Sequence, residues 1–103
     1  MAPQPAVRDP LLALSSPRRR EILRLVWTDE RSAGDIAGAF EVTWPAISQN
    51  LGVLRRAGLV TERRAANRRY YRADPQALGS LRAVLQEMWT QDLDRLRRVV
   101  EER

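Results

Sequence analysis

Three short polar side chains, Ser48, Gln49 and Asn50, stand together in a segment that otherwise has the pattern of an amphipathic helix. Hydroxyl and carboxamide groups can make the hydrogen bonds that base edges offer in the major groove of duplex DNA, and Gln or Asn can bond an adenine bidentately. Thr43 and Trp44, at the start of the segment, add a methyl group and a ring that could touch a thymine methyl. These five residues form the candidate base-reading set, and the alternative for each is a solvated helix position.

Arginines supply the charge around these residues. Residues 43–73 hold seven Arg against one acid, Glu62, which gives a net charge of +6. Residues 1–42 have six Arg against six acids and residues 74–103 have five against six, so the formal charge of +5 lies entirely in the middle segment. A basic patch confined to one part of a chain is typical of a phosphate-binding surface.

The candidate phosphate contacts fall at a helix end and in a basic hairpin. They are Arg55, Arg56, Arg64, Asn67, Arg68 and Arg69. Arg18 and Arg19 crowd the first turn of an earlier helix, where three Arg oppose the helix dipole. For them, phosphate contact and an ordinary solvated helix start are left open.

Capping and turn signals predict a helix-turn-helix over about 32–58. Ser32 and Thr43 are the expected N-caps of its two helices, and Gly58 ends the second one. The second helix should turn Ile47, Leu51 and Leu54 toward the core, because they follow one another at i, i+4 and i+7.

A two-stranded wing is expected at about 59–73. Strand-like residues 60–65 and 68–73 flank Ala66 and Asn67, and we expect Asn67 to take the positive φ of the turn. Tyr70 and Tyr71 then point to opposite faces, one inward and one along a neighbouring surface.

Before these elements, residues 1–8 are Pro-rich and are expected to form a flexible arm. Asp9-Pro10 and Ser16-Pro17 each pair an N-cap with a proline at the first helical position. They predict a short helix and then a second helix that reaches Trp27.

After the wing, one long helix is expected over about 75–100, as part of a single domain that spans 9–103. Its apolar stripe is too long for so small a head, so the remainder is expected to pack against a second copy with help from the first helix. The expected dimer contacts are Leu11, Leu12, Leu81, Leu85, Met88, Trp89, Leu93 and Leu96. A plain core helix, and a small apolar effector pocket near Met88 and Trp89, are the alternatives.

Composition excludes several classes of function. The 103 residues contain no Cys and no His, so disulfides, thiolate or imidazole metal ligands and a Cys or His nucleophile are ruled out. Asp92 and Asp94 point in different directions on a helix and are expected to be solvated rather than metal ligands. Without clustered carboxylates or a Gly-rich phosphate loop, no enzyme site and no cofactor are expected. No apolar run approaches the roughly 18 residues of a membrane span and no signal peptide opens the chain, which predicts a cytoplasmic protein with no membrane partner.

The segments LSSPRRREILRLV, SAGDIAGAFEVTWPAISQNLGVLRRAGLVTERRAANRRYYR and MWTQDLDRL resemble the ArsR/SmtB family of bacterial winged-helix repressors, over roughly residues 9–100. The resemblance implies a homodimer built on the first and last helices. It also implies one recognition helix per protomer, a near-palindromic operator in double-stranded DNA, and an effector that lowers DNA affinity.

Some positions depart from the family pattern. Classical members sense metals through Cys pairs or through Asp and His, so this chain resembles the branch without those ligands, whose signals are commonly unknown. The pattern has a polar or basic residue where Trp44 stands, His where Asn50 stands and Lys or Arg where Gly52 stands. Gly52 inside a helix should cost about 1 kcal/mol relative to Ala, and it would let the backbone approach DNA or another helix closely.

The fold expected from the sequence is mainly α with a small β-hairpin wing: a winged helix-turn-helix that dimerises through its first and last helices. The function expected is that of a dimeric, sequence-specific, non-metal-sensing repressor. The alternative is a winged-helix interaction module that docks a protein partner through the Trp44 face, because this fold does not by itself fix function.

Overall fold

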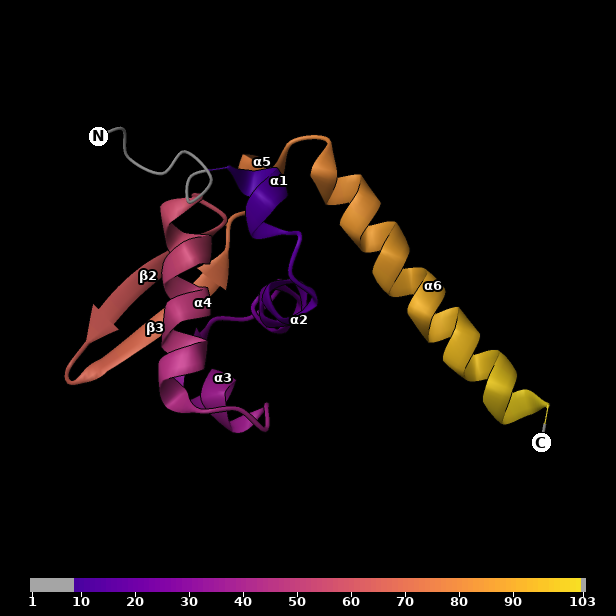
Figure 1. The fold of residues 1–103 in the computed structure, drawn as a ribbon, viewed down its shortest axis with the longest axis horizontal. Helices are drawn as coiled ribbons and strands as arrows, with labels where there is room; N and C mark the ends of the chain where they lie inside the picture. Colours follow the sequence, from indigo (N-terminus) through magenta and orange to yellow (C-terminus); the bar gives the residue numbers. More distant parts are fainter. Residues whose placement is uncertain (1–8, 103) are drawn as a thin grey trace.

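The computed structural model describes residues 9–102, apart from the side chains of Leu93 and Asp94, so the arm expected at 1–8 lies outside the described residues. The elements follow the chain as α1 (Pro10–Ala13), α2 (Pro17–Leu25), β1 (Arg31–Ser32), α3 (Ala33–Gly38), α4 (Trp44–Arg56), β2 (Val60–Ala65), β3 (Arg68–Ala73), α5 (Pro75–Leu78) and α6 (Leu81–Glu101). Helices α1 to α4 and the sheet form a head, and α6 extends away from it (Figure 1).

Local capping starts helices α1 to α4 where the sequence indicated. Asp9 accepts the Leu11 N–H at α1, and Ser16 accepts the Arg19 N–H at α2. Ser32 and Thr43 cap α3 and α4 in the same way, through the backbone N–H three residues further on. These bonds satisfy donors that have no partner inside the helix. Helix α2 ends at Leu25, two residues short of the expected end at Trp27.

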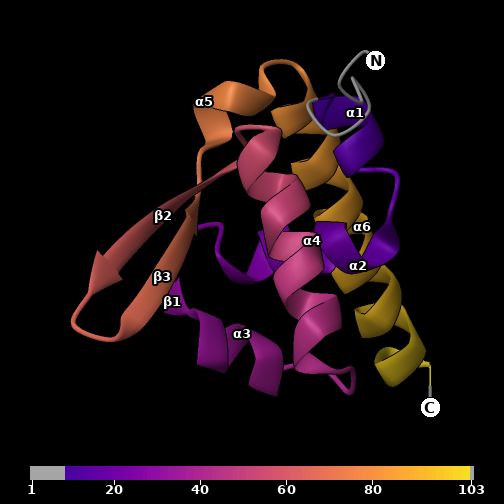
Figure 2. The same ribbon diagram turned by 60° about the vertical axis from the view of Figure 1, so that its left-hand side comes forward.

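The sheet has three strands in the order β1-β3-β2, whereas the sequence predicted only the hairpin. Strands β2 and β3 have the expected bounds, and they pair antiparallel from Val60 with Ala73 to Ala65 with Arg68. Strand β1 pairs Arg31 with Tyr71 and Ser32 with Tyr70. The wing is therefore joined to the start of α3 along its other edge (Figure 2).

The hairpin turn differs from the expectation in one residue. Ala66 has a φ of +54°, and it is the non-glycine residue with a positive φ among those described, so Asn67 does not take this role. A tight two-residue loop needs positive φ at its first central position to match the twist of the strands, and the register sets that position at Ala66.

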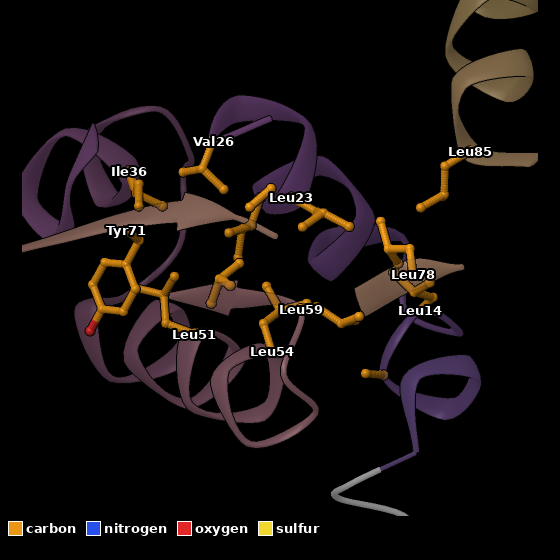
Figure 3. Close-up of a cluster of buried hydrophobic side chains, with 14 of the residues drawn as sticks. Leu14, Leu23, Val26, Ile36, Leu51, Leu54, Leu59, Tyr71, Leu78 and Leu85 are labelled. Carbon is orange, nitrogen blue, oxygen red and sulfur yellow. The ribbon is translucent and has the colours of Figure 1, made fainter. Parts of the chain in front are cut away.

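The core lies between α2, α3, α4 and the inner face of the sheet (Figure 3). The three predicted α4 residues, Ile47, Leu51 and Leu54, are buried, as are Ile22 and Leu23 of α2. The remaining members of this core include Val26, Ile36, Leu59, Val60 and Tyr71. The 3.6-residue periodicity therefore identified the inner face of α4 correctly.

The predicted helix over 75–100 is interrupted. Helix α5 ends at Leu78, and α6 begins at Leu81 after Gly79, whose φ is +56°. A left-handed residue cannot continue an α-helix, so the chain turns here and α6 takes its own direction (Figure 1).

Among the described side chains of α6, the ones that belong to the core of the head come from its first half. Leu85 points toward Leu78 and Leu14 (Figure 3), and Trp89 packs edge-on against Trp27 with ring centroids 5.0 Å apart. Leu85 and Trp89 are therefore buried in their own chain, although the sequence assigned them to contacts with a second copy. The side chain of Leu93, another expected dimer contact, lies outside the described residues.

An apolar surface remains uncovered where α1 and α6 meet. Its central groove has a volume of about 310 Å³ and is lined by Leu11, Leu14, Ser15, Arg20, Leu81, Val84, Leu85 and Met88. Leu11 is 64% exposed and Val84 is 53% exposed. Leu12, Leu96, Val99 and Val100 are further exposed apolar side chains of the same two helices. We call this surface the α1–α6 face.

No helix within residues 9–102 is both long and apolar enough to cross a lipid bilayer. In the same part of the chain, Asp and Glu side chains do not gather in threes that could hold a metal ion.

Candidate nucleic-acid interface

Helix α4 lies beside the wing (Figure 2), and polar side chains of α4 are exposed to solvent. Ser48 and Gln49 are exposed one turn after the Thr43 N-cap, whereas the neighbouring Ile47 and Leu51 are buried. Since the core fixes the rotation of the helix, the two polar side chains have a defined outward direction. Thr43 is also exposed, while its hydroxyl oxygen accepts the Ala46 N–H at 3.4 Å.

Asn50 lies at the edge of this face and is half-buried against α2. Its Oδ1 accepts a hydrogen bond from Nη1 of Arg19 at 3.3 Å. Nε of Arg19 also donates to the Ala13 carbonyl at 2.6 Å, so one guanidinium joins α1 to α4. Contact of Asn50 and Arg19 with DNA stays a prediction, and each of them also makes a structural contact that the sequence did not indicate.

The other two arginines of the first turn of α2 are also engaged within the chain. Nη1 of Arg20 donates to the Leu14 carbonyl at 2.8 Å. The Arg18 guanidinium lies over the Phe40 ring, 4.8 Å from its centroid. These contacts hold α1 and the segment that follows α3 in place, so the turn is not simply a solvated helix start. Phosphate contact by Arg18 and Arg19 stays a prediction.

Trp44 is 50% exposed and lines a groove of about 530 Å³ between the start of α3, the start of α4 and the tip of the wing. The wing side of the groove consists of Asn67, Arg68 and Arg69, all exposed. One candidate base-reading residue, Trp44, and three candidate wing residues therefore border the same concave surface. Sequence reasoning assigned these residues separately and gave no sign that they border a shared groove.

Besides the pairing of β1 with β3, a side chain of the wing connects it to the head. This side chain is Arg63, which was not among the residues selected from the sequence. Nε and Nη2 of Arg63 donate to both carboxylate oxygens of Glu30, at 3.0 and 2.6 Å. This hydrogen bonding holds the pKa of Glu30 below its ordinary value. The same guanidinium lies over the ring of Tyr70, its partner across the two strands, at 4.7 Å. Because successive residues of a strand face opposite sides of the sheet, the alternation could have placed Arg63 on the other face from Glu62 and Arg64.

On the inner face of the wing, Glu62 is surrounded by cations. Its Oε2 accepts a hydrogen bond from the Tyr71 hydroxyl at 3.0 Å, and its Oε1 lies 3.5 Å from Nε of Arg64. Nε of Arg55, in the last turn of α4, is 3.9 Å from Oε2. Burial raises the pKa of Glu62, but the hydrogen bonds from Tyr71 and Arg64 and the charges of Arg69 and Arg55 outweigh burial, so the pKa is lowered. The carboxylate is therefore ionised at neutral pH.

Gly52 has no close neighbour that requires a glycine. A Cβ built there would meet the mobile end of its own helix neighbour Arg56, with Nη1 3.1 Å away. Within the described chain, no other helix approaches this position closely enough to explain the glycine.

Gly52→Ala is accordingly expected to raise the free energy of unfolding by about 1 kcal/mol, because alanine restricts the unfolded chain and favours the helix. Urea denaturation of the two proteins measures the change. Gly58→Ala is the matched control, and it should lower stability because φ is +78° there. A loss of stability in Gly52→Ala would show that the glycine has a packing role.

Comparison with known proteins agrees with this architecture. Residues 16–62 match the family model for bacterial regulatory proteins of the arsR family. The chain is 40% identical over 81 residues to the HTH-type transcriptional regulator Rv2034 of Mycobacterium tuberculosis, an alignment that covers 79% of this chain and 76% of that protein. It is 39% identical over 59 residues to the transcriptional repressor SdpR of Bacillus subtilis, covering 57% of this chain and 66% of the relative.

Solved structures give the same result. The homodimeric winged helix-turn-helix DNA-binding domain Mb0332 of Mycobacterium bovis superimposes with a TM-score of 0.68 at 31% identity, over 88% of this chain and 92% of that chain. The family consists of DNA-binding regulators rather than enzymes. From its helix-turn-helix, its β2–β3 wing in a three-stranded sheet and these relatives, the chain belongs to the ArsR family of bacterial transcriptional regulators.

Proposed function

We propose that the protein is a cytoplasmic homodimeric repressor that reads a near-palindromic operator in double-stranded DNA. The observation that carries the proposal is that α4, whose Ser48 and Gln49 are exposed, lies beside the basic wing (Figure 2), and that Trp44 at its start borders a groove with Asn67, Arg68 and Arg69. In this arrangement α4 enters the major groove, and Ser48 and Gln49 face base edges one turn after the start of the helix.

The wing residues bind the sugar-phosphate backbone of the DNA. Asn67, Arg68 and Arg69 border the groove beside Trp44 and are exposed, so they are placed to bind phosphates or an adjacent minor groove next to α4. Arg55 and Arg56, in the last turn of α4, are a second set of phosphate contacts and are also exposed. These contacts position the protein, while the α4 side chains provide sequence discrimination.

The α1–α6 face supports the dimer. It includes exposed leucines and valines from α1 and α6, with a shared apolar groove between them, and such patches commonly mark interaction sites. The Mycobacterium bovis neighbour is a homodimer. With two copies related by a two-fold axis, the half-site centres are expected about 10 bp apart, and a repressor role accords with the relative SdpR.

The test is selection of bound duplexes from a random DNA pool by the full-length protein at about 150 mM salt. We expect enrichment of an inverted repeat. The mass of the protein alone and of its complex, from sedimentation, should correspond to a dimer. Failure of a folded, dimeric protein to enrich any sequence would contradict operator reading, and a protein that binds DNA as a monomer would contradict the dimer.

A further inference from the structure

Within the basic surface, Glu62 is chemically out of place. It is the single acid among residues 43–73, and a carboxylate near bound DNA repels the phosphates that seven arginines attract. Its side chain is only 18% exposed, whereas those of Arg55 and Arg64 are 52% and 66% exposed. The acid therefore lies behind the two cations, which remain open to a ligand on their outer side.

The position of Glu62 is fixed from both strands of the wing. Glu62 and Tyr71 are direct partners across the antiparallel pair, and the Tyr71 hydroxyl donates to Oε2 at 3.0 Å. Burial and this hydrogen bond raise the pKa of Tyr71, so its proton stays in place as a donor. Tyr71 is itself part of the core, so the carboxylate is anchored to the rigid part of the head rather than to the wing tip.

The anchored carboxylate connects two elements that are expected to contact the DNA backbone. Arg55 belongs to the last turn of α4, and Arg64 belongs to β2. Glu62 and Arg64 are two residues apart on one strand and so share the face that looks toward α4. The contacts at 3.9 Å to Arg55 and 3.5 Å to Arg64 are loose and solvent-accessible, so a phosphate oxygen can replace the carboxylate at little cost.

We propose that Glu62 is a specificity-determining counter-charge, which holds Arg55 and Arg64 in the free protein and is exchanged for DNA phosphates on binding. This inference rests on the proposed function. In the operator complex, α4 is seated in the major groove and holds the phosphates in one register, so they replace the carboxylate on both arginines. On unrelated DNA the phosphates have no fixed register and replace the carboxylate incompletely, so its repulsion lowers the non-specific affinity more than the operator affinity and widens the ratio between them.

The test is Glu62→Gln, measured on a random-sequence duplex between about 50 and 200 mM salt. The variant keeps the shape and an acceptor for Tyr71 but removes the charge. Binding to random DNA should tighten about fivefold at the lowest salt, and the slope of log K against log salt should steepen by about one, because two released arginines bind phosphate more fully. The duplex enriched by selection should gain less, so the specificity ratio falls.

The matched control is Glu101→Gln, which makes the same charge change at the far end of α6 from the wing (Figure 1). It should leave the affinity within about twofold, since the site is well beyond the screening length. A double-mutant cycle with Arg64→Gln distinguishes the release of Arg64 by Glu62→Gln from the general effect of one negative charge fewer. Loss of Arg64 should weaken binding more in the Glu62→Gln background than in the wild type.

Unchanged or weaker binding of random DNA by Glu62→Gln, or strictly additive effects in the cycle, would overturn the inference while leaving DNA binding established. A wild-type protein without salt-dependent binding would overturn the proposed function as well. If Glu62→Gln does not fold, the exchange can be tested in the wild-type protein by NMR. The Nε–H signals of Arg55 and Arg64 should shift when the duplex is added. Signals that stay in place would contradict the exchange.

Discussion

Val84→Asp is expected to convert the protein into a monomer and to weaken operator binding by about 100-fold or more. Val84 is 53% exposed on the α1–α6 face, next to Leu81, Leu85 and Met88. In a two-fold dimer the substitution occurs twice, and a carboxylate transferred into an apolar interface loses its hydration without gaining a partner. The monomer keeps its fold, because Val84 contributes little to the core of its own chain.

The loss of affinity follows from linkage between the two half-sites. A dimer presents two α4 helices together, so the second half-site binds at a high effective concentration. A monomer binds each half-site alone. Analytical ultracentrifugation measures the assembly, and a mobility-shift titration with the selected duplex measures the affinity.

Thr90→Asp is the matched control for this experiment. It also replaces an exposed, β-branched residue of α6 with an aspartate, but six residues further on, about 240° around the helix axis from Val84. It should remain dimeric with near wild-type affinity. A Val84→Asp protein that stays dimeric would place the interface elsewhere, and a monomer that still binds the operator tightly would remove the need for a dimer.

Gln49→Ala is expected to cost about 1–3 kcal/mol on the selected operator, or about 5- to 150-fold in Kd, with little effect on random DNA. Gln49 is exposed at the centre of the outward face of α4, and its carboxamide is the group there that suits an adenine. Removing it leaves the base donor and acceptor without partners in a desolvated groove, while the phosphate contacts of the wing persist.

Competition binding at fixed salt gives both affinities for Gln49→Ala, and Gln76→Ala on α5 supplies the same chemical change at an exposed site outside α4. The helix itself should tolerate the change, since alanine has the highest helix propensity. Equal losses on the operator and on random DNA would show that Gln49 contacts the backbone instead of a base.

Signals that act within a few residues were sufficient to predict most of the elements. A cap such as Ser32 or Thr43 satisfies the backbone N–H three residues later, and the period of Ile47, Leu51 and Leu54 needs only the helix to define its inner face. The wing strands were predicted with their observed bounds because alternation and the flanking turn residues are local as well.

Features that depend on distant partners were not predictable in the same way. Strand β1 has two residues and becomes a strand only because β3 is beside it. The hydrogen bond between Arg19 and Asn50 joins residues 31 positions apart in the sequence, and the one between Arg63 and Glu30 joins residues 33 positions apart. At the candidate site, composition identified the basic wing. The packing of α3, α4 and the sheet creates the groove between Trp44 and Arg69, and it brings Arg55 of α4 to Glu62, which composition could not predict.

The interruption at Gly79 has a consequence for how this protein can change over evolutionary time. In an unbroken helix from 75 to 101, one inserted residue would rotate everything after it by about 100° and carry the apolar stripe off the partner. With the left-handed residue between α5 and α6, the phase of α6 is set by Leu85 and Trp89 on the head rather than by the wing. Insertions or deletions at this joint are therefore absorbed locally. The module that reads DNA and the module that pairs two chains can diverge in sequence separately, so new operators and new assembly partners do not have to arise together.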